Sequence, residues 1–358
     1  MTRPRRIRAG GASLPAGPAT CSALPRSHHV HRIQPAHPDG AARRRRGEFP
    51  STGIEPPERR RFLRPGTLTP FALLTPALIA LVVITGWPLL QLLIMSFQEY
   101  GRAQVFGAPP EFVGLENYID ILTDAEFWGV LGRSVAFAAV CVVATMVLGV
   151  LIALLMNRLG KVMRTVVSVG LLLSWAMPPL SATIVWGWIF DPQYGVLNNI
   201  LTNWFGLDFA GHPWLLEPLS FFFVAAIIIV WGAIPFVVFT VFAGLTQVPD
   251  EVLEAAQLDG AGGTKRFFLV VVPYIKSILV IVTILQIIWD LRVFTQIYAL
   301  QSIGGLAEQT NTLGVYIYRV SLGSGDFGVG GAISVIVVLL LAAVSIFYVR
   351  QTVKEDSL

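Results

Sequence analysis

Six long apolar runs, separated by short polar connections, limit what this chain can fold into. A helix that crosses a lipid bilayer needs about 20 predominantly apolar residues, and each run reaches that length. None of them shows the alternation of apolar and polar residues that a membrane β-barrel strand requires. We therefore predict an all-α integral membrane protein with six transmembrane helices. The runs are residues 70–97, 130–156, 166–190, 219–245, 275–300 and 329–349.

The composition supports the membrane class. Hydrophobic residues make up 54% of the 358 residues and charged residues make up 13%, and the mean hydropathy is +0.66. A soluble domain of this length has too little interior to bury so much apolar surface. The two cysteines, Cys21 and Cys141, lie in a polar segment and in an apolar run. Neither a disulfide nor a metal site is expected from them.

The first 66 residues differ from the rest of the chain. They concentrate the arginines, for example in the runs 43–46 and 59–61, and they are rich in Pro, Gly and Ala without apolar periodicity. Such a segment cannot bury enough surface to offset its chain entropy. We predict a disordered basic cytoplasmic tail over 1–66, a six-span domain over 67–350, and a short cytoplasmic C-terminal tail over 351–358.

The basic tail has several possible interpretations. Its composition imitates a transit peptide and a nucleic-acid-binding arm. A cytoplasmic extension that favours anionic lipid headgroups fits it better, as does a start codon placed too early in an arginine-rich reading frame. Membrane lipids are therefore expected partners, and nucleic acid is not.

The orientation of the spans follows from the Lys and Arg residues in the short connections. One set of connections is basic, and the opposite set has few cations among many carboxylates. We predict that both termini and the connection after the fourth run are cytoplasmic, in a multi-pass protein of a bacterial plasma membrane. The basic set contains Arg158, Lys161, Arg164, Lys265, Arg266, Lys276, Arg350 and Lys354, and the opposite set contains Arg102, Arg133 and Arg319. Most tryptophans near the ends of the runs are expected to be headgroup-level anchors, although some could stack on a sugar ring.

The connection between the fourth and fifth runs is expected to form a helix–turn–helix. Pro249 suits the first turn of a helix, and Asp250 and Glu251 then lie at the positive end of its dipole. Gly260 is well placed to end this helix in a left-handed conformation. A second amphipathic helix follows, and Pro273 opens the next run.

This connection is similar to the EAA loop of binding-protein-dependent ABC importer permeases. The pattern is Glu254-Ala255-Ala256, three residues, Gly260, nine residues, and then apolar-x-apolar-Pro ending at Pro273. In that family the loop is where the membrane subunit docks on its ATPase. The resemblance implies that an ABC ATPase dimer is a partner. It also implies that the ATPase-coupling residues are Glu254, Ala255, Ala256, Asp259 and Gly260. The alternative is an ordinary interfacial loop that only separates two spans.

The chain is not expected to hydrolyse nucleotide itself. Residues 260–265 are glycine-rich, but they lack the Gly-Lys-Ser/Thr ending of a phosphate-binding loop and no strand precedes them. By the resemblance, ATP hydrolysis belongs to a separate subunit. No cofactor, metal site or catalytic residue is predicted.

Two further segments resemble the carbohydrate branch of the family, the maltose-type larger permease. Residues 112–118 match an F-x-G-L-x-N-Y segment, and residues 289–305 resemble a segment of the form F-D-x-I-Y-x-L-T-x-G-G-P. The second match departs at Thr295, Gln301 and Leu306, which leaves the identity of the sugar open. The resemblance covers residues 68–350. It implies a second homologous permease subunit and an extracytoplasmic lipoprotein that binds the substrate.

Charged residues within a span are costly, by about 2.5–3.5 kcal/mol each on insertion scales, so Asp290 and Arg292 need an explanation. At i and i+2 they point to different sides of a helix and do not form a pair. Two interpretations stay open: they line a translocation path for sugar hydroxyls, or they bond to neighbouring helices or to the second permease. The candidate path residues are Gln286, Asp290, Arg292, Gln296 and Tyr298. Pro178, Pro179 and Pro235 are expected to kink the third and fourth spans.

The predicted function is that of a permease subunit, in an ATP-driven importer that moves a sugar or oligosaccharide from an extracytoplasmic binding protein into the cytoplasm. Permeases for glycerol-phosphate-type or polyamine substrates share the docking loop and remain alternatives. A secondary transporter would need acidic relays along its spans, and only Asp290 is available. A scaffold that recruits an ATPase without transporting anything is a further alternative.

Overall fold

The computed structural model describes residues 69–355, and most of this part is helical. The predicted N-terminal tail, residues 1–66, and its boundary with the six-span domain lie outside the described residues. Within the described residues, four helical stretches are long and apolar enough to cross a membrane by themselves. They are Leu73–Met95, Ala125–Arg158, Pro218–Leu245 and Phe327–Ile346. Two bent helix pairs raise the number of spans to six if each pair counts as one. The chain is thus a multi-pass helical membrane protein.

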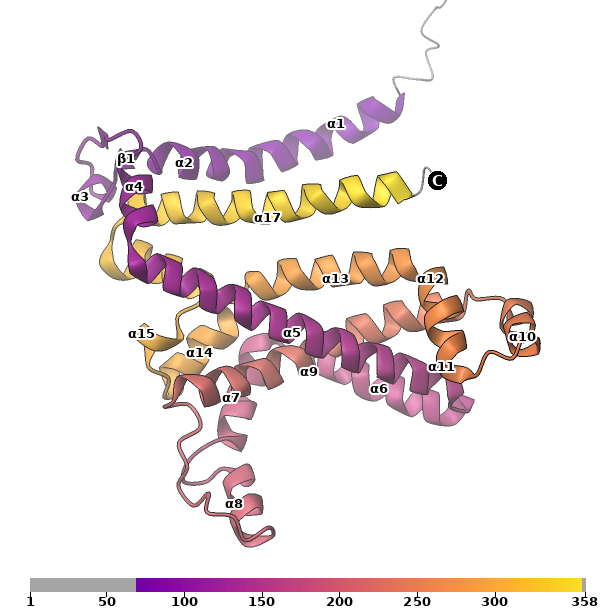
Figure 1. Cartoon of the computed structure of the whole chain (residues 1–358). Helices are drawn as coiled ribbons and strands as arrows, with labels where there is room; N and C mark the ends of the chain where they lie inside the picture. Colours follow the sequence, from indigo (N-terminus) through magenta and orange to yellow (C-terminus); the bar gives the residue numbers. More distant parts are fainter. Residues whose placement is uncertain (1–68, 356–358) are drawn as a thin grey trace, which may run out of the picture. The chain divides into compact units, whose positions relative to one another are not determined.

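The first of these stretches consists of α1 (Thr69–Leu81), the π-helical turn η2 (Val82–Gly86) and α2 (Trp87–Met95). It contacts the rest of the molecule through α2, which lies beside α17 (Phe327–Glu355), as Figure 1 shows. None of the residues in its most apolar window is buried. A surface this apolar requires contact with hydrocarbon or protein rather than with water.

The third predicted span, residues 166–190, is not one continuous helix. It forms α6 (Lys161–Ala176) and α7 (Pro179–Ile189), which meet at 102°. Met177 and Pro178 are extended, with ψ angles of 126° and 136°, because a residue that precedes a proline is driven away from the helical region. The expected kink is therefore a complete interruption of the helix. Pro235, by contrast, is accommodated within the continuous helix α9 (Pro218–Leu245).

The fifth predicted span, residues 275–300, is also interrupted. Helix α13 (Lys276–Leu291) ends before three non-helical residues, and α14 (Thr295–Ile303) begins after them. At its other end, α13 meets the stretch Gly263–Tyr274 at 75°. This stretch comprises α11 (Gly263–Arg266), the π-helical turn η3 (Phe267–Val271) and α12 (Val272–Tyr274). The run predicted as one span, residues 275–300, thus forms two helices, α13 and α14.

The centre of the molecule is the packing of α5 (Ala125–Arg158) on α9. Gly149 permits the two helices to approach closely, because a Cβ placed there would lie 2.5 Å from the Cγ1 of Val237. Small residues at such crossings are typical of membrane helix pairs. Helix α13 contacts both α5 and α9, and α7 contacts α14. These helices surround the site described below.

The end of the molecule opposite the loop α10 (Asp250–Leu258) contains short elements. They are β1 (Gln98–Glu99), α3 (Arg102–Val105), β2 (Glu111–Phe112), α4 (Glu116–Thr123), α8 (Val196–Asn203), α15 (Ala307–Thr310), α16 (Leu313–Tyr318) and η4 (Arg319–Ser324). The two strands pair antiparallel, so the all-α prediction misses one small sheet. The amide of Asn117 donates to the carbonyl oxygens of Ser96 and Gln98, each at 3.0 Å, and so joins α4 to this corner.

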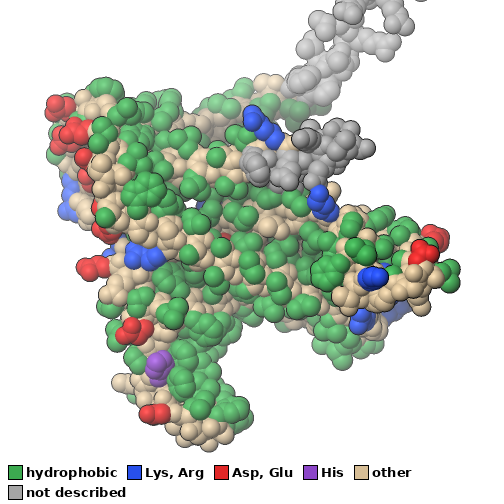
Figure 2. Space-filling model, in the orientation of Figure 1, with side chains coloured by type: hydrophobic (Ala, Val, Ile, Leu, Met, Phe, Trp, Pro, Cys, Tyr) green, Lys and Arg blue, Asp and Glu red, His purple; other side chains and the backbone are tan. Residues whose placement is uncertain are grey.

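Acidic side chains gather at that end. Figure 2 shows them over the region of α3 and α4, whereas hydrophobic side chains cover much of the rest of the visible face. Burial and the nearby Asp124 and Glu126 carboxylates raise the pKa of Tyr316 to about 12. Its phenol therefore stays protonated and donates to Asp124 Oδ2 at 3.3 Å, which joins α16 to the start of α5.

Candidate functional site

The loop between α9 and α13 folds as a helical hairpin, here called the α10 hairpin (residues 249–274). Pro249 is extended and immediately precedes the helix, so it lies one position before the first turn in which the sequence placed it. Asp250 and Glu251 occupy that first turn, as predicted. Half-buried Leu253 and Phe267 pack against a cluster that includes Met156 at the end of α5. The hairpin is thus anchored where α5 turns into α6.

Gly260 ends α10 in the left-handed conformation that the sequence predicted, with φ +79°. The N–H of Ala261 donates to the Ala256 carbonyl at 3.0 Å, and the N–H of Gly260 donates to the Gln257 carbonyl at 3.0 Å. This bond pair is the Schellman arrangement, which satisfies carbonyls that a helix end leaves free. It reverses the chain toward α11. Arg266 Nη1 then donates to Gln257 Oε1 at 3.1 Å and joins the two arms of the hairpin.

Four of the five predicted coupling residues are exposed on this hairpin, and Ala256 is half-buried. Small side chains at 255, 256 and 260 leave the backbone open to close approach, and Glu254 and Asp259 add carboxylates beside it. Leu258 was not among the predicted coupling residues, and its side chain is 89% exposed between these two acids. A leucine this exposed at the tip of a hairpin is the kind of apolar contact that a partner protein would bury. The sequence signal that could have identified Leu258 is its position directly before Asp259 and Gly260, where the predicted helix ends.

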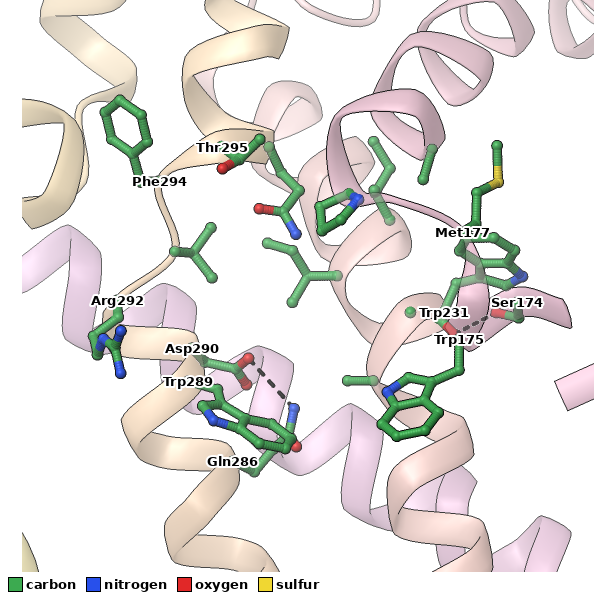
Figure 3. Close-up of a pocket in the computed structure, with 18 residues that line it drawn as sticks. Ser174, Trp175, Met177, Trp231, Gln286, Trp289, Asp290, Arg292, Phe294 and Thr295 are labelled. Carbon is green, nitrogen blue, oxygen red and sulfur yellow. Dashed lines mark hydrogen bonds between the residues drawn. The ribbon is translucent and has the colours of Figure 1, made fainter. Parts of the chain in front are cut away.

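A second feature is a cavity of about 460 Å³ beside the two helix interruptions. Its walls come from the α6–α7 break, the middle of α9, the end of α13 and the start of α14 (Figure 3). Four of the five predicted path residues line it: Gln286, Asp290, Arg292 and Gln296. The helix breaks thus bring polar side chains and non-helical backbone to one place, which is the usual condition for irregular backbone at membrane depth.

Gln286 and Asp290 form the polar centre of the cavity. Both side chains are buried, and Gln286 Nε2 donates to Asp290 Oδ1 at 3.4 Å across one helical turn (Figure 3). The amide oxygen of Gln286, Oε1, and the second carboxylate oxygen of Asp290, Oδ2, have no hydrogen-bond partner within the described part of the chain. A buried acceptor without a donor costs about 1–3 kcal/mol or more. Gln286 and Asp290 therefore keep hydrogen-bonding capacity in the cavity wall that the described residues do not use.

The remaining path residues are arranged differently. Arg292 caps the end of α13, is exposed, and points away from the Asp290 carboxylate in Figure 3, in agreement with the predicted lack of a direct pair. Tyr298 does not line the cavity. Its ring stacks on Phe294, with centroids 5.3 Å apart, and meets the edge of Tyr318 at 5.1 Å. Phe294 joins this aromatic cluster to the cavity wall.

Aromatic side chains in the cavity wall were mostly missed. Trp175, Trp231 and Trp289 all line it, and Figure 3 shows the rings of Trp175 and Trp289 on opposite sides of Gln286. Trp175 was included among the expected headgroup anchors, and the other two were not considered. Because hydropathy windows treat tryptophan only as an apolar residue, they gave no signal that the helix breaks would direct these rings inward.

Comparison with known proteins identifies the family. The model of the binding-protein-dependent transport system inner membrane component matches residues 145–354. The diacetylchitobiose uptake system permease protein DasB of Streptomyces coelicolor is 41% identical over 293 residues, covering 82% of this chain and 89% of that protein. The trehalose/maltose transport system permease protein MalF of Thermococcus litoralis is 34% identical over 242 residues, covering 67% and 79%.

A solved structure shows the same fold. A chain in the crystal structure of a bacterial alginate ABC transporter, in complex with an alginate pentasaccharide-bound periplasmic protein, superimposes with a TM-score of 0.68. It is 20% identical, and the alignment covers 79% of this chain and 93% of that one. Together these findings show that the chain belongs to the binding-protein-dependent transport system inner membrane components, the permease subunits of ABC transporters.

Proposed function

We propose that this permease subunit imports a sugar or short oligosaccharide and that the substrate passes the cavity around Gln286 and Asp290. The two unpartnered acceptors in that cavity are the observation that carries the proposal. Sugar hydroxyls are donors that would satisfy them, and the tryptophan rings beside them offer apolar faces to a pyranose ring. The diacetylchitobiose and trehalose/maltose permeases among the relatives support the same substrate class.

The energy for transport comes, in this proposal, from a separate ABC ATPase dimer that docks on the α10 hairpin. The hairpin lies near the end of α5 and the start of α6, which contain Arg158, Lys161 and Arg164. The acidic side chains over α3 and α4 lie at the other end (Figure 2). This asymmetry supports a cytoplasmic hairpin by the positive-inside rule. The exposed Leu258, with Glu254 and Asp259 beside it, would enter a cleft on the ATPase that has basic residues at its rim.

A second homologous permease would complete the path. The cavity is open rather than enclosed on all sides, and exposed Trp175 and Trp289 lie at its border. We infer that the partner permease covers this side and that an extracytoplasmic binding protein delivers the sugar at the acidic end. Alternating access would then be a two-state equilibrium that both the sugar and ATP shift.

The Asp290 carboxylate also favours a second candidate, a cationic substrate such as a polyamine. A glycerol-phosphate-type substrate has less support, because Arg292 is the only cation that the described residues contribute to the cavity wall. The test is ATP-dependent uptake into proteoliposomes that contain the assembled transporter and its binding protein. Labelled disaccharides, a labelled polyamine and a labelled glycerol phosphate are supplied in turn. The proposal expects a disaccharide to accumulate, and uptake of only the polyamine or the phosphate ester would overturn it.

Asp290→Asn tests the site itself. The exchange keeps one acceptor but removes the charge, and hydrogen bonds to charged groups contribute about 1.5–3 kcal/mol. Sugar uptake at low substrate concentration should therefore fall about tenfold or more. Asp120→Asn, the same exchange at an exposed position on α4, should leave uptake unchanged. Equal uptake by the two variants would remove Asp290 from the path.

A further inference from the structure

A groove between α5 and α9 lies outside the translocation cavity and has no role in the proposed transport path. It has a volume of about 620 Å³, which is within the range of about 300–1,000 Å³ for ligand clefts. On α5 its lining residues follow a helical spacing on one face: Arg133, Ala136, Phe137 and Val140. Apart from Arg133 and Ser220, the side chains of its lining are apolar. The groove is therefore suited to a hydrocarbon chain.

Arg133 is the charged group of this groove. Its side chain is half-buried, and its Nε atom is buried without a hydrogen-bond partner among the described residues. The described residues also place no carboxylate in an ion pair with it. A guanidinium presents N–H donors in a planar fork that fits a phosphate group. The groove thus combines an apolar channel with one cation that lacks an anion.

The depth of Arg133 in the bilayer fits the headgroup boundary. Helix α5 has 34 residues, a length of about 50 Å, and the hydrocarbon core is about 30 Å thick. For an upright helix centred in the bilayer, about 10 Å of α5 projects at each end, and Arg133 lies about 12 Å from the start at Ala125. Trp214 borders the same groove, and its indole N–H donates to Asn198 Oδ1 at 2.6 Å. A tryptophan whose indole N–H is hydrogen-bonded and whose ring is apolar is typical of the membrane–water interface.

The groove faces away from the translocation cavity. Successive residues of a helix are rotated by about 100°, so Ile228 and Gly232 of the cavity wall point to the side of α9 opposite to Leu219 and Ala226 of the groove. A partner permease that covers the cavity would therefore leave the groove in contact with the bilayer.

We propose that this groove holds one acyl chain of an anionic phospholipid, whose phosphate is bound by Arg133. The lipid belongs to the leaflet at the end opposite the α10 hairpin. It fills a hollow between the two helices that form the centre of the fold, and it supplies the anion that the described protein lacks at this position. This inference does not depend on which solute is transported.

Photolabelling tests the proposal. The assembled transporter is placed in phosphatidylcholine nanodiscs that contain a trace of phosphatidylglycerol with a diazirine at the end of one chain. A parallel sample contains phosphatidylcholine with the same diazirine chain. We expect labelled peptides from residues 133–140 and 219–226, and about fivefold more label from phosphatidylglycerol, which corresponds to one cation near a charged headgroup. The Arg133→Gln exchange should reduce that preference to the level of phosphatidylcholine, and Arg133→Lys should retain most of it.

A second pair of variants tests the groove apart from the charge. Ala136→Trp fills the groove and should reduce labelling by both lipids, whereas Val135→Trp, at an exposed position outside the groove, should leave labelling unchanged. ATPase activity shows that each variant is assembled. Equal labelling by the two lipids in the wild type, label mainly on the second permease, or an Ala136→Trp variant that labels normally would each overturn the proposal.

Discussion

Replacement of Gly260 by alanine should weaken the coupling between ATP hydrolysis and transport without unfolding the chain. The residue has φ +79°, and a Cβ added there would meet nothing within 4 Å. The cost is therefore conformational, about 1–2 kcal/mol for a non-glycine residue in the left-handed region. That energy lowers the population of the correctly ended α10 about 5- to 30-fold relative to competing backbone conformations.

The chain offers matched controls for this experiment. Gly263 also has open space around its Cβ position but has no positive φ, so Gly263→Ala should have no effect. Asparagine tolerates the left-handed region, so Gly260→Asn should retain most of the coupling. The assay is sugar uptake per ATP hydrolysed in proteoliposomes, at equal amounts of each variant in the membrane.

Two results would refute the reasoning. If Gly260→Ala and Gly263→Ala transport equally well, the Schellman end of α10 does not matter for coupling. If Gly260→Asn is as defective as Gly260→Ala, the glycine is needed for space at a partner surface and not for its backbone angle.

Two further predictions concern packing within the helix bundle. Gly149→Ala should destabilise the fold by about 1–3 kcal/mol, because the new Cβ collides with Val237; thermal unfolding in detergent should show this loss, and Gly129→Ala on the same helix, with open space, should not. Ser134→Ala should cost about 1–3 kcal/mol, because the buried Ser134 Oγ accepts the N–H of Leu313 at 2.8 Å and no acceptor would replace it. The readout is faster amide exchange at Leu313, and unchanged exchange would count against this role.

The sequence predicted those features that depend on local chemistry. The apolar runs marked α5, α9 and α17 closely, because a membrane helix satisfies its backbone internally and needs only length and hydrophobicity. The left-handed end at Gly260 was also predicted correctly, since few other residues adopt that conformation. The number of spans, the location of the hairpin in the cell and the roles of the coupling and path residues stay predictions.

The helix interruptions were harder to predict. Pro178 and Pro179 signalled a disturbance, but proline inside a membrane helix is often tolerated, as at Pro235. The break after Leu291 has neither proline nor glycine, so no local rule reveals it. It depends on tertiary contacts, such as the donation of Thr312 Oγ1 to the Val293 carbonyl at 3.3 Å. Because the cavity is assembled at these breaks, its three tryptophans could not be recognised from the linear order of residues.

The interruptions after α6 and α13 have a mechanical consequence. An unbroken helix must sacrifice main-chain hydrogen bonds in order to bend inside hydrocarbon, and each loss there is costly. At residues 177–178 and 292–294 the continuous i→i−4 ladder is already interrupted, so a change of angle there needs mainly changes in a few backbone torsions. Helices α7 and α14, which follow the two interruptions, contact each other. We therefore expect them to move together. This part of the cavity wall is then expected to move about two hinges, at residues 177–178 and 292–294, during transport.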